Sequence, residues 1–165
     1  AGSLVRGSAL LVRTEARGES ACRAGTDTRW FTGDEPASLQ DFANIADEGS
    51  RSDYPKGWAF EAGLDDGYRA HAPVGTFGAN PFGLHDMHGN LWEWCRDGWV
   101  DRPAAARPGD GLRPGGPGGV QVPNVFRGGS YFDPAVAARC AHRAYGDSTK
   151  GHHTLGLRPA RVLTR

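Results

Sequence analysis

The sequence has few cysteines, no net charge and no long apolar run. Its 165 residues include three cysteines, and its 19 lysines and arginines are balanced by 19 aspartates and glutamates. Three cysteines are too few for a disulfide scaffold, and their spacing fits no zinc motif. Balanced charge gives no reason to expect nucleic acid as a partner. No apolar run approaches the ~20 residues of a membrane-spanning helix, and no signal peptide is legible, so we expect no membrane span.

Familiar catalytic motifs are also missing. The chain has neither a Gly-x-Ser-x-Gly nucleophile elbow nor a phosphate-binding loop. His85 and His88 have a spacing that can serve a metal, but both fall inside a turn that explains them structurally. The length predicts a single domain. Nothing in the composition indicates the compartment.

Glycine, proline and aromatic residues are plentiful instead. The 25 glycines and 11 prolines, together with five tryptophans and seven phenylalanines, describe an ordered domain rich in loops. We expect residues 1–12 to be irregular, with residues 4–8 resembling the remnant of a tag, and residues 13–165 to form the domain.

A few local patterns predict elements within the domain. Residues 14–23 read as a short helix with Thr14 as its N-cap. Strands are expected from Val125 and over residues 155–162. The prolines and glycines between Trp99 and Asn124 predict an exposed excursion, in which residues 115–119 exclude helix.

The most informative stretch covers residues 81–95. It holds two tryptophans and two carboxylates, Asp86 and Glu93, around the turn signal Gly89-Asn90. Carboxylates beside inward-pointing carbonyls are what a hard divalent cation, calcium above all, requires. The alternative is that Asp86 caps the turn and Glu93 pairs with an arginine.

Residues 83–95, GLHDMHGNLWEWC, closely resemble the core motif of the sulfatase-modifying-factor, or formylglycine-generating-enzyme, family. Further matches follow in the family's order: TEA at 14–16 with ACRAGT at 21–26, DGY at 66–68 with APVG at 72–75, RGGSY at 127–131 and LGLR at 155–158. The resemblance implies an α+β, C-type-lectin-like fold with short strands and long loops. That fold carries both catalysts and binders, so function is a separate inference.

The resemblance also implies calcium sites and a cysteine pair. Carried over by position, the first calcium would bind the side chains of Asn44 and Asp66 and the carbonyls of Ile45 and Tyr68. The second would bind Asp86 and Glu93 with the carbonyls of Gly89 and Leu91. Oxygen-only ligands of this kind suit calcium in a structural role. Cys22 and Cys140 match positions that are bridged in some secreted members; a bridge and two buried thiols both remain open.

The family's enzymes use two copper-binding cysteines just after the Gly-Gly-Ser-Tyr motif, because soft thiolates bind copper(I). Here Asp133 stands near the first expected position, and no cysteine lies between it and Cys140. We therefore expect no copper and no oxidase activity.

Residues 131–154 mix aromatic, small and histidine residues, a composition suited to a contact surface. They resemble the display region of variable proteins of diversity-generating retroelements. The sequence thus predicts a non-catalytic domain that binds a protein, peptide or glycan ligand; the alternative is a formylglycine-generating-enzyme-like oxidoreductase, or a fragment of one, acting on protein cysteine. The expected ligand contacts are Tyr131, Phe132, Asp133, Ala135, Val136, His142, Ala144, Tyr145, Gly146, His152, His153 and Thr154.

Overall fold

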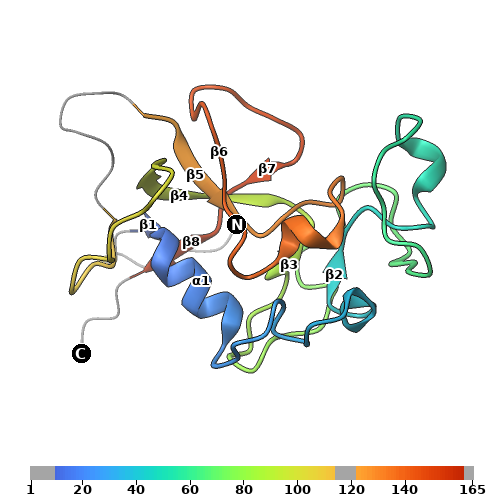
Figure 1. Ribbon diagram of the computed structural model, residues 1–165, viewed down its shortest axis with the longest axis horizontal. Coiled ribbons are helices and arrows are strands. Elements are labelled where there is room, and N and C mark those ends of the chain that lie inside the picture. Colours follow the sequence, from blue (N-terminus) through green and yellow to red (C-terminus); the bar gives the residue numbers. More distant parts are fainter. Residues whose placement is uncertain (1–9, 114–121, 162–165) are drawn as a thin grey trace, which may run out of the picture.

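The computed structural model describes residues 10–113 and 122–161, and long loops connect its short elements (Figure 1). The central unit is a four-stranded sheet in the order β6-β5-β4-β7. It is built from β4 (Trp92–Gly98), β5 (Asn124–Arg127), β6 (Ala144–Gly146) and β7 (Leu155–Gly156). Strands β4, β5 and β6 pair antiparallel, whereas β7 pairs parallel with β4. Among the described residues, no helix is long and apolar enough to cross a membrane.

Helix α1 (Glu15–Arg23) packs beside β4 and β5 and confirms the helix expected at residues 14–23. Thr14 is the N-cap residue and has extended backbone angles, but its side chain makes no capping hydrogen bond. Gly18 weakens the helix in isolation. A Cβ at this position would meet the Arg13 guanidinium at 3.0 Å, so the packing of Arg13 favours glycine here.

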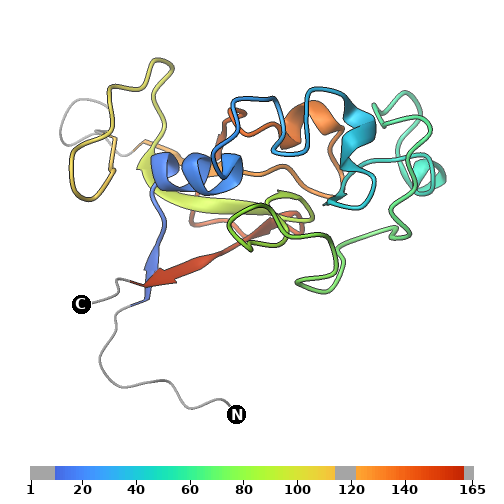
Figure 2. The same cartoon turned by 90° about the horizontal axis from the view of Figure 1, so that it is seen from below.

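The chain ends of the described region form a separate antiparallel pair, β1 (Leu10–Val12) with β8 (Pro159–Arg161). Figure 2 shows this pair leaving the body of the molecule on the side of β4 away from α1. Residues 10–12 are therefore not irregular, as the sequence suggested, because a partner some 150 residues away fixes them as a strand. The tag-like residues 4–8 lie outside the described residues.

The single strand expected at residues 155–162 is instead two. Strand β7 belongs to the central sheet and β8 to the pair with β1, with Leu157 and Arg158 between them. Strand β5 confirms the strand expected from Val125. The described parts of the excursion between Trp99 and Asn124 form no helix, and residues 115–119 lie outside the described residues.

A two-residue parallel pair, β2 (Ala43–Asn44) with β3 (His88–Gly89), joins the core motif to the loop region. Gly89 has φ +72°, and a Cβ there would lie 1.9 Å from the Asn44 carbonyl oxygen. Asn90 is also left-handed, and its N–H donates to the same carbonyl at 2.7 Å. Only glycine permits this approach, which explains the turn predicted at Gly89-Asn90.

The apolar core lies between the loops and the sheet. One cluster unites Trp30, Leu39, Ile45, Leu64 and two alanines of the short 3₁₀ turn Ala135–Ala138. The indole of Trp30 donates to the Ala135 carbonyl at 3.0 Å, which anchors this turn. Two further 3₁₀ turns, Pro36–Leu39 and Arg51–Asp53, lie in the loop region at the far end of the molecule from β1 and β8.

A buried charge cluster fastens α1 to the sheet and the excursion. Glu15 is wholly buried and forms ion pairs with Arg113, Arg127 and Arg143, which we call the Glu15 cluster. Asp97 accepts the backbone N–H groups of Glu15 and Arg113 at 2.7 and 2.9 Å. Burial alone would raise the pKa of Glu15, but the hydrogen bond from Arg143 and the three guanidinium charges hold it below its usual 4.5.

Candidate ligand-binding surface

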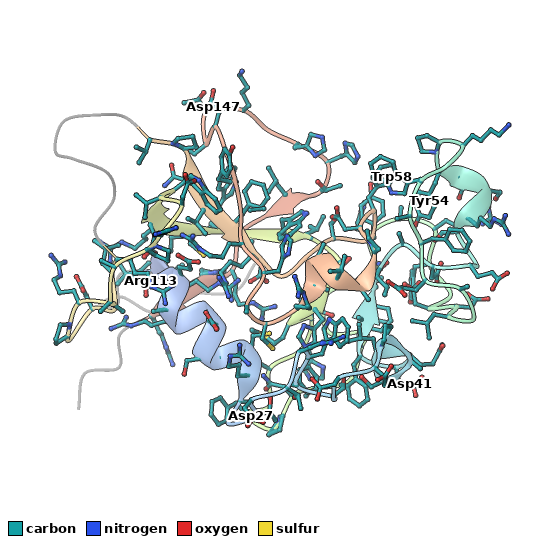
Figure 3. The ribbon with its side chains drawn as sticks, in the orientation of Figure 1. Asp27, Asp41, Tyr54, Trp58, Arg113 and Asp147 are labelled. Atoms are coloured by element: carbon teal, nitrogen blue, oxygen red, sulfur yellow. The ribbon has the colours of Figure 1, made fainter. Side chains whose placement is uncertain are left out.

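Seven aromatic and imidazole rings gather where the loop of residues 51–60 meets the segment after the Gly-Gly-Ser motif. We call this the aromatic surface, and it consists of Tyr54, Trp58, His71, Tyr131, Phe132, His152 and His153. The Phe132 ring lies 4.9 Å from Trp58 and 5.1 Å from Tyr54, centroid to centroid. Trp58 and the three histidines are exposed, and the other three rings are half-buried. Figure 3 shows Tyr54 and Trp58 side by side at this end of the molecule.

The main chain below these rings is held by groups from other segments. The Tyr54 hydroxyl donates to the Tyr131 carbonyl at 3.0 Å, and the Trp58 indole donates to the Phe132 carbonyl at 2.9 Å. The N–H of Tyr131 donates to the Asn90 carbonyl at 3.0 Å. The side chains at 131 and 132 therefore take no part in fixing their own backbone.

The sequence did not indicate Tyr54 and Trp58 as part of this surface. Both lie in a polar, glycine-punctuated loop more than 70 residues from their partners. The available signal was two aromatic residues within an otherwise polar loop, which is a weak one. Asp47 accepts from the N–H and hydroxyl of Ser50, whose hydroxyl lies 2.7 Å from that of Tyr54, so the loop is well supported.

The structure divides the twelve expected contacts by exposure. Val136, Tyr145, His152 and His153 are exposed, while Tyr131, Phe132, Asp133, His142, Ala144 and Gly146 are half-buried. Ala135 and Thr154 are buried, at 0 and 7 % exposure, so neither offers surface to a ligand. Ala135 belongs to the core cluster, which explains why a small residue stands there.

Three of these residues, Ala144, Tyr145 and Gly146, form β6 and belong to a second aromatic group. Tyr145 stacks on Trp99 at 4.4 Å, and the Arg143 guanidinium lies over the other ring at the same distance. His142 instead lies beside Trp92, at 5.7 Å between centroids. The burial of His142 lowers its pKa, so the ring is neutral near pH 7.

Asp133, which stands where the sequence comparison expected a copper-binding cysteine, is used structurally. Its Oδ2 accepts from the Trp92 indole at 2.8 Å and from the Ser130 hydroxyl. A carboxylate so placed ties the segment after Ser130 to β4. All three cysteines are buried, and none lies at the aromatic surface.

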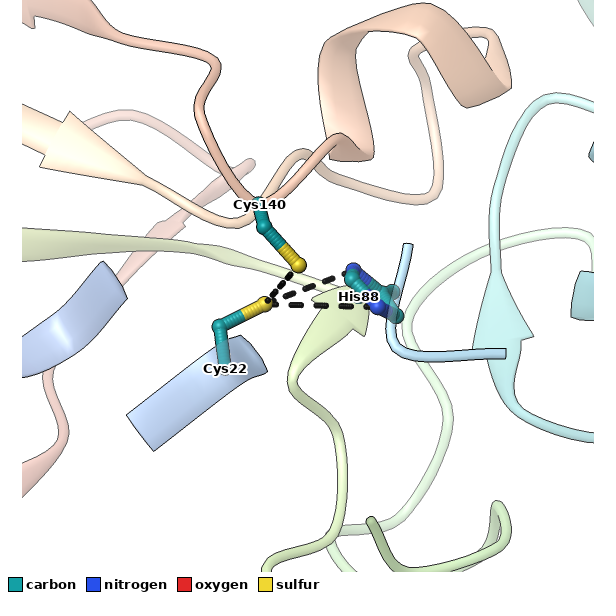
Figure 4. Close-up of side chains that lie close together, drawn as sticks. All are labelled: Cys22, His88 and Cys140. Atoms are coloured by element: carbon teal, nitrogen blue, oxygen red, sulfur yellow. Dashed lines mark hydrogen bonds between the residues drawn. The ribbon is translucent and has the colours of Figure 1, made fainter. Parts of the chain in front are cut away.

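Cys22, His88 and Cys140 form a buried cluster in the interior (Figure 4). The two sulfurs are 3.2 Å apart and unbonded, and the Cys22 sulfur is 3.7 Å from His88 Nδ1. The hydrogen bond from Cys22 lowers the pKa of Cys140, and this contact and burial raise the pKa of Cys22.

Both ring nitrogens of His88 are already engaged. Nδ1 lies 2.7 Å from the Ala138 carbonyl, and Nε2 lies 3.2 Å from the N–H of Phe31. A neutral ring that donates from Nδ1 and accepts at Nε2 satisfies both contacts. The phenyl ring of Phe31 also stacks on the imidazole. These contacts give the cluster a structural role.

The first expected calcium set fits a cation. The side-chain oxygen Oδ1 of Asn44 is buried and accepts no hydrogen bond from any described residue. Asp66 lies beside it in the chain's packing, with its two oxygens receiving the N–H groups of Ile45 and Tyr68. Burial is the largest influence on Asp66 and raises its pKa to about 6. An orphaned oxygen next to a carboxylate whose charge is disfavoured is a suitable partial shell for calcium.

The second expected set fits less well. Glu93 forms ion pairs of 2.7 Å with both Arg13 and Arg158, one at each oxygen. Arg158 also donates to the carbonyls of His85 and Asp86. Asp86 accepts from the N–H of Gly75 through one oxygen, and the other is buried without a described partner. Two guanidinium groups already neutralise Glu93, so this carboxylate is not free to bind a cation.

The short strands, single flanking helix and long loops define an α+β, C-type-lectin-like fold of the formylglycine-generating-enzyme type. The structure of Treponema denticola variable protein 1 matches with a TM-score of 0.69 and 26% identity, over 94% of this chain and 49% of that one. PvdO from Pseudomonas aeruginosa matches with a TM-score of 0.72 and 26% identity, over 95% of this chain and 54% of that one.

The chain belongs to the family described as the sulfatase-modifying factor enzyme 1-like domain, whose model matches residues 9–163. Formylglycine-generating enzyme from Bos taurus is 33% identical over 153 residues, or 89% of this chain. Those residues are 37% of the bovine enzyme, so the chain spans well under half of that relative. The likeness to a variable protein agrees with the resemblance inferred from residues 131–154.

Proposed function

We propose that this domain is a non-catalytic binder that presents the aromatic surface to a protein, peptide or glycan ligand. The observation that supports it is the separation between backbone and side chain at Tyr131 and Phe132. Their carbonyls are held by Tyr54 and Trp58, while their rings face neighbouring rings and solvent. Aromatic rings on a fixed backbone supply contact area at low cost in conformational entropy.

The same separation suits a surface whose side chains vary. A substitution at 131 or 132 leaves the donors Tyr54 and Trp58 in place, because they bind carbonyl oxygens that every residue has. The likeness to a protein named as variable supports this extension. Tyr131, Phe132, His152 and His153 would then be diversified positions, and Ala135 and Thr154 would be fixed because they are buried.

A second candidate is an oxidoreductase that acts on protein cysteine, and the 33% identity to bovine formylglycine-generating enzyme favours it. The residues do not fit copper(I) at the position the family implies. Asp133 occupies that position and binds Trp92 and Ser130, and both Cys22 and Cys140 are in the interior. Incubation with copper(I) and a cysteine-containing sulfatase peptide, read by mass spectrometry, tests this candidate directly. Formylglycine in the product would end the binder proposal.

The diversified form of the proposal is tested by sequencing this gene across its source population, from the codon for Ser130 to that for Gly156. We expect changes at the exposed aromatic and histidine positions and none at Ala135, Asp133 or Thr154. Uniform sequence over the whole segment would leave a binder with a fixed surface. Changes that fall equally on buried and exposed positions would contradict the proposal that this surface is the selected one.

Binding itself is tested with glycan arrays and a phage-displayed peptide library, each probed with the wild-type chain and with Trp58→Ala/Tyr131→Ala. Tyr145→Ala is the matched control, because Tyr145 is equally aromatic and exposed but belongs to the group around Trp99. Ligands lost in the double variant and kept in the control support the aromatic surface. The reverse result would move the site to β6.

Calcium in the first set is also part of the proposal. Asn44 and Asp66, with the carbonyls of Ile45 and Tyr68, would hold it, and the orphaned Asn44 oxygen is the supporting observation. A cation there would pin the loop that carries Tyr54 and Trp58, since Asp47 links the two by accepting from Asp66 N–H and from Ser50. Its role would be structural.

A further inference from the structure

A partly enclosed cavity of about 240 Å³ lies between the β1–β8 pair and the body of the domain. Helix α1, the segment before β3 and strand β4 complete its walls. Figures 1 and 2 both place β1 and β8 at the end of the molecule away from the loop of residues 51–60. The cavity is therefore separate from the aromatic surface.

The lining combines two kinds of side chain. Leu11, Val12, Leu84 and Met87 provide an apolar interior, and five arginines stand around it: Arg13, Arg17, Arg96, Arg158 and Arg161. No aspartate or glutamate is among the lining residues. A cavity lined by charges of one sign against apolar walls concentrates the electric field and attracts the opposite ion.

Few of these charges are neutralised within the described part of the chain. Arg13 and Arg158 share the single carboxylate of Glu93. Arg17 donates only to the Gly109 carbonyl, and Arg96 and Arg161 form no ion pair with any described residue. Five positive charges thus face one negative charge.

Arg13 gives an independent indication. Its side chain is 8% exposed, and its Nε–H is buried without a hydrogen-bond acceptor among the described residues. A buried guanidinium nitrogen without an acceptor is energetically unfavourable, by roughly 1–3 kcal/mol. An oxygen-bearing anion in the cavity would add acceptors and negative charge beside it.

We propose that this cavity binds a small amphiphile: an aliphatic chain with one anionic head group, a carboxylate or a phosphate ester. The guanidinium fork matches either head group, and the leucines, valine and methionine match the chain. The volume lies just below the ~300–1,000 Å³ of sites for drug-sized ligands, so the ligand is small. Nothing in this proposal depends on the aromatic surface or on its ligand.

Calorimetric titration of the full chain tests the proposal with octanoate and octyl phosphate as probes. We expect saturable binding of one or both at one site per chain, weakened by salt, and the stronger of the two identifies the head group. Octanol tests the charge, acetate tests the chain, and octyltrimethylammonium tests the sign. Equal binding of octanol, or no binding of either anion, would overturn the proposal.

Two variants place the binding in this cavity. Arg96→Gln should weaken binding of the anion by roughly tenfold or more, because a hydrogen-bonded charge is lost. Arg102→Gln is the matched control, an exposed arginine outside the cavity. Ala160→Phe should block the cavity without a change in charge, and Ala105→Phe controls for an added ring on an exposed loop.

Thermal unfolding of each variant confirms that it is folded. If Arg96→Gln and Ala160→Phe bind as the wild type does, the site is elsewhere and the proposal fails. Sedimentation gives a further outcome: a concentration-dependent dimer that Ala160→Phe dissociates would show that a second copy covers the cavity. That result would also overturn the amphiphile.

Discussion

In the Glu15 cluster the side chains bind one another, whereas in the aromatic surface side chains from one loop bind the backbone of another. Glu15 contacts three arginines from distant segments, and every partner depends on the identity of the others. Tyr54 and Trp58 bind carbonyl oxygens, so the residues that own those carbonyls can change. The first arrangement fixes sequence, and the second fixes shape while leaving sequence free.

The comparison can be broken most strongly at Glu15. Glu15→Gln would leave three buried or half-buried guanidinium groups without their carboxylate, and loss of one partner of a buried pair costs about 3–5 kcal/mol. We expect a loss of that size in the free energy of unfolding, measured by urea denaturation. Glu19→Gln on the same helix is the control, because Glu19 is partly exposed and should cost at most about 1 kcal/mol. Equal losses in both variants would contradict the special role of Glu15.

The pH dependence of stability should carry the same signature. The folded-state pKa of Glu15 is below its usual 4.5, so the folded chain binds this proton less tightly than the unfolded chain. Its contribution is therefore present above about pH 4.5 and lost as the pH falls through the lower, folded-state pKa. Melting temperatures of the wild type should fall over this acid range by more than those of Glu15→Gln. Parallel curves for the two proteins would show that Glu15 is not the group responsible.

Residues with local signals were predictable, and those defined by distant partners were not. The helix after Thr14 and the left-handed turn at Gly89-Asn90 follow from capping and glycine chemistry within a few residues. Strand β1 forms because β8 lies beside it, and no pattern within residues 10–12 encodes that partner. Tyr54 and Trp58 joined the site only through contacts across more than 70 residues.

The family resemblance predicted chemistry unevenly for the same reason. It placed Asn44 and Asp66 where a buried oxygen lacks a partner, which local motif matching can achieve. It could not reveal that Arg13 and Arg158 converge on Glu93, because they come from opposite ends of the chain. Likewise, alternation of residue types within 131–154 could not separate exposed Val136 from its buried neighbour Ala135.

Calcium removal tests the support of the aromatic surface from below. A ligand bound only by the folded state at a hundredfold excess over its dissociation constant adds about 2.7 kcal/mol of stability. We expect a chelator to lower the melting temperature of the wild type and to have no effect on Asn44→Ala, which lacks the orphaned oxygen. Elemental analysis that finds no calcium, together with no chelator effect, would show that the first set is not a calcium site.

Tyr54→Phe sharpens the comparison at the level of one hydrogen bond. It removes the hydroxyl that donates to the Tyr131 carbonyl and lies beside Ser50, so a loss of about 1 kcal/mol in unfolding free energy is expected. Tyr145→Phe is the matched control, because the Tyr145 hydroxyl forms no hydrogen bond with any described residue. Ligand binding should weaken in Tyr54→Phe although no ring is lost. Unchanged binding would mean that the carbonyl contact does not position the surface.

Tyr131→Ala should have the smallest effect on stability and a large effect on binding. Its ring is half-buried and contacts His71, Phe132 and His153, while its N–H and carbonyl remain available to Asn90 and Tyr54. Substitutions on such a surface usually change the unfolding free energy by no more than about 0.5 kcal/mol, whereas an interface hot spot loses about 2 kcal/mol or more of binding. Urea denaturation and titration with a ligand recovered from the arrays measure the two quantities on the same protein. A collapse of stability would make Tyr131 part of the framework, and the aromatic surface would then resemble the Glu15 cluster rather than contrast with it.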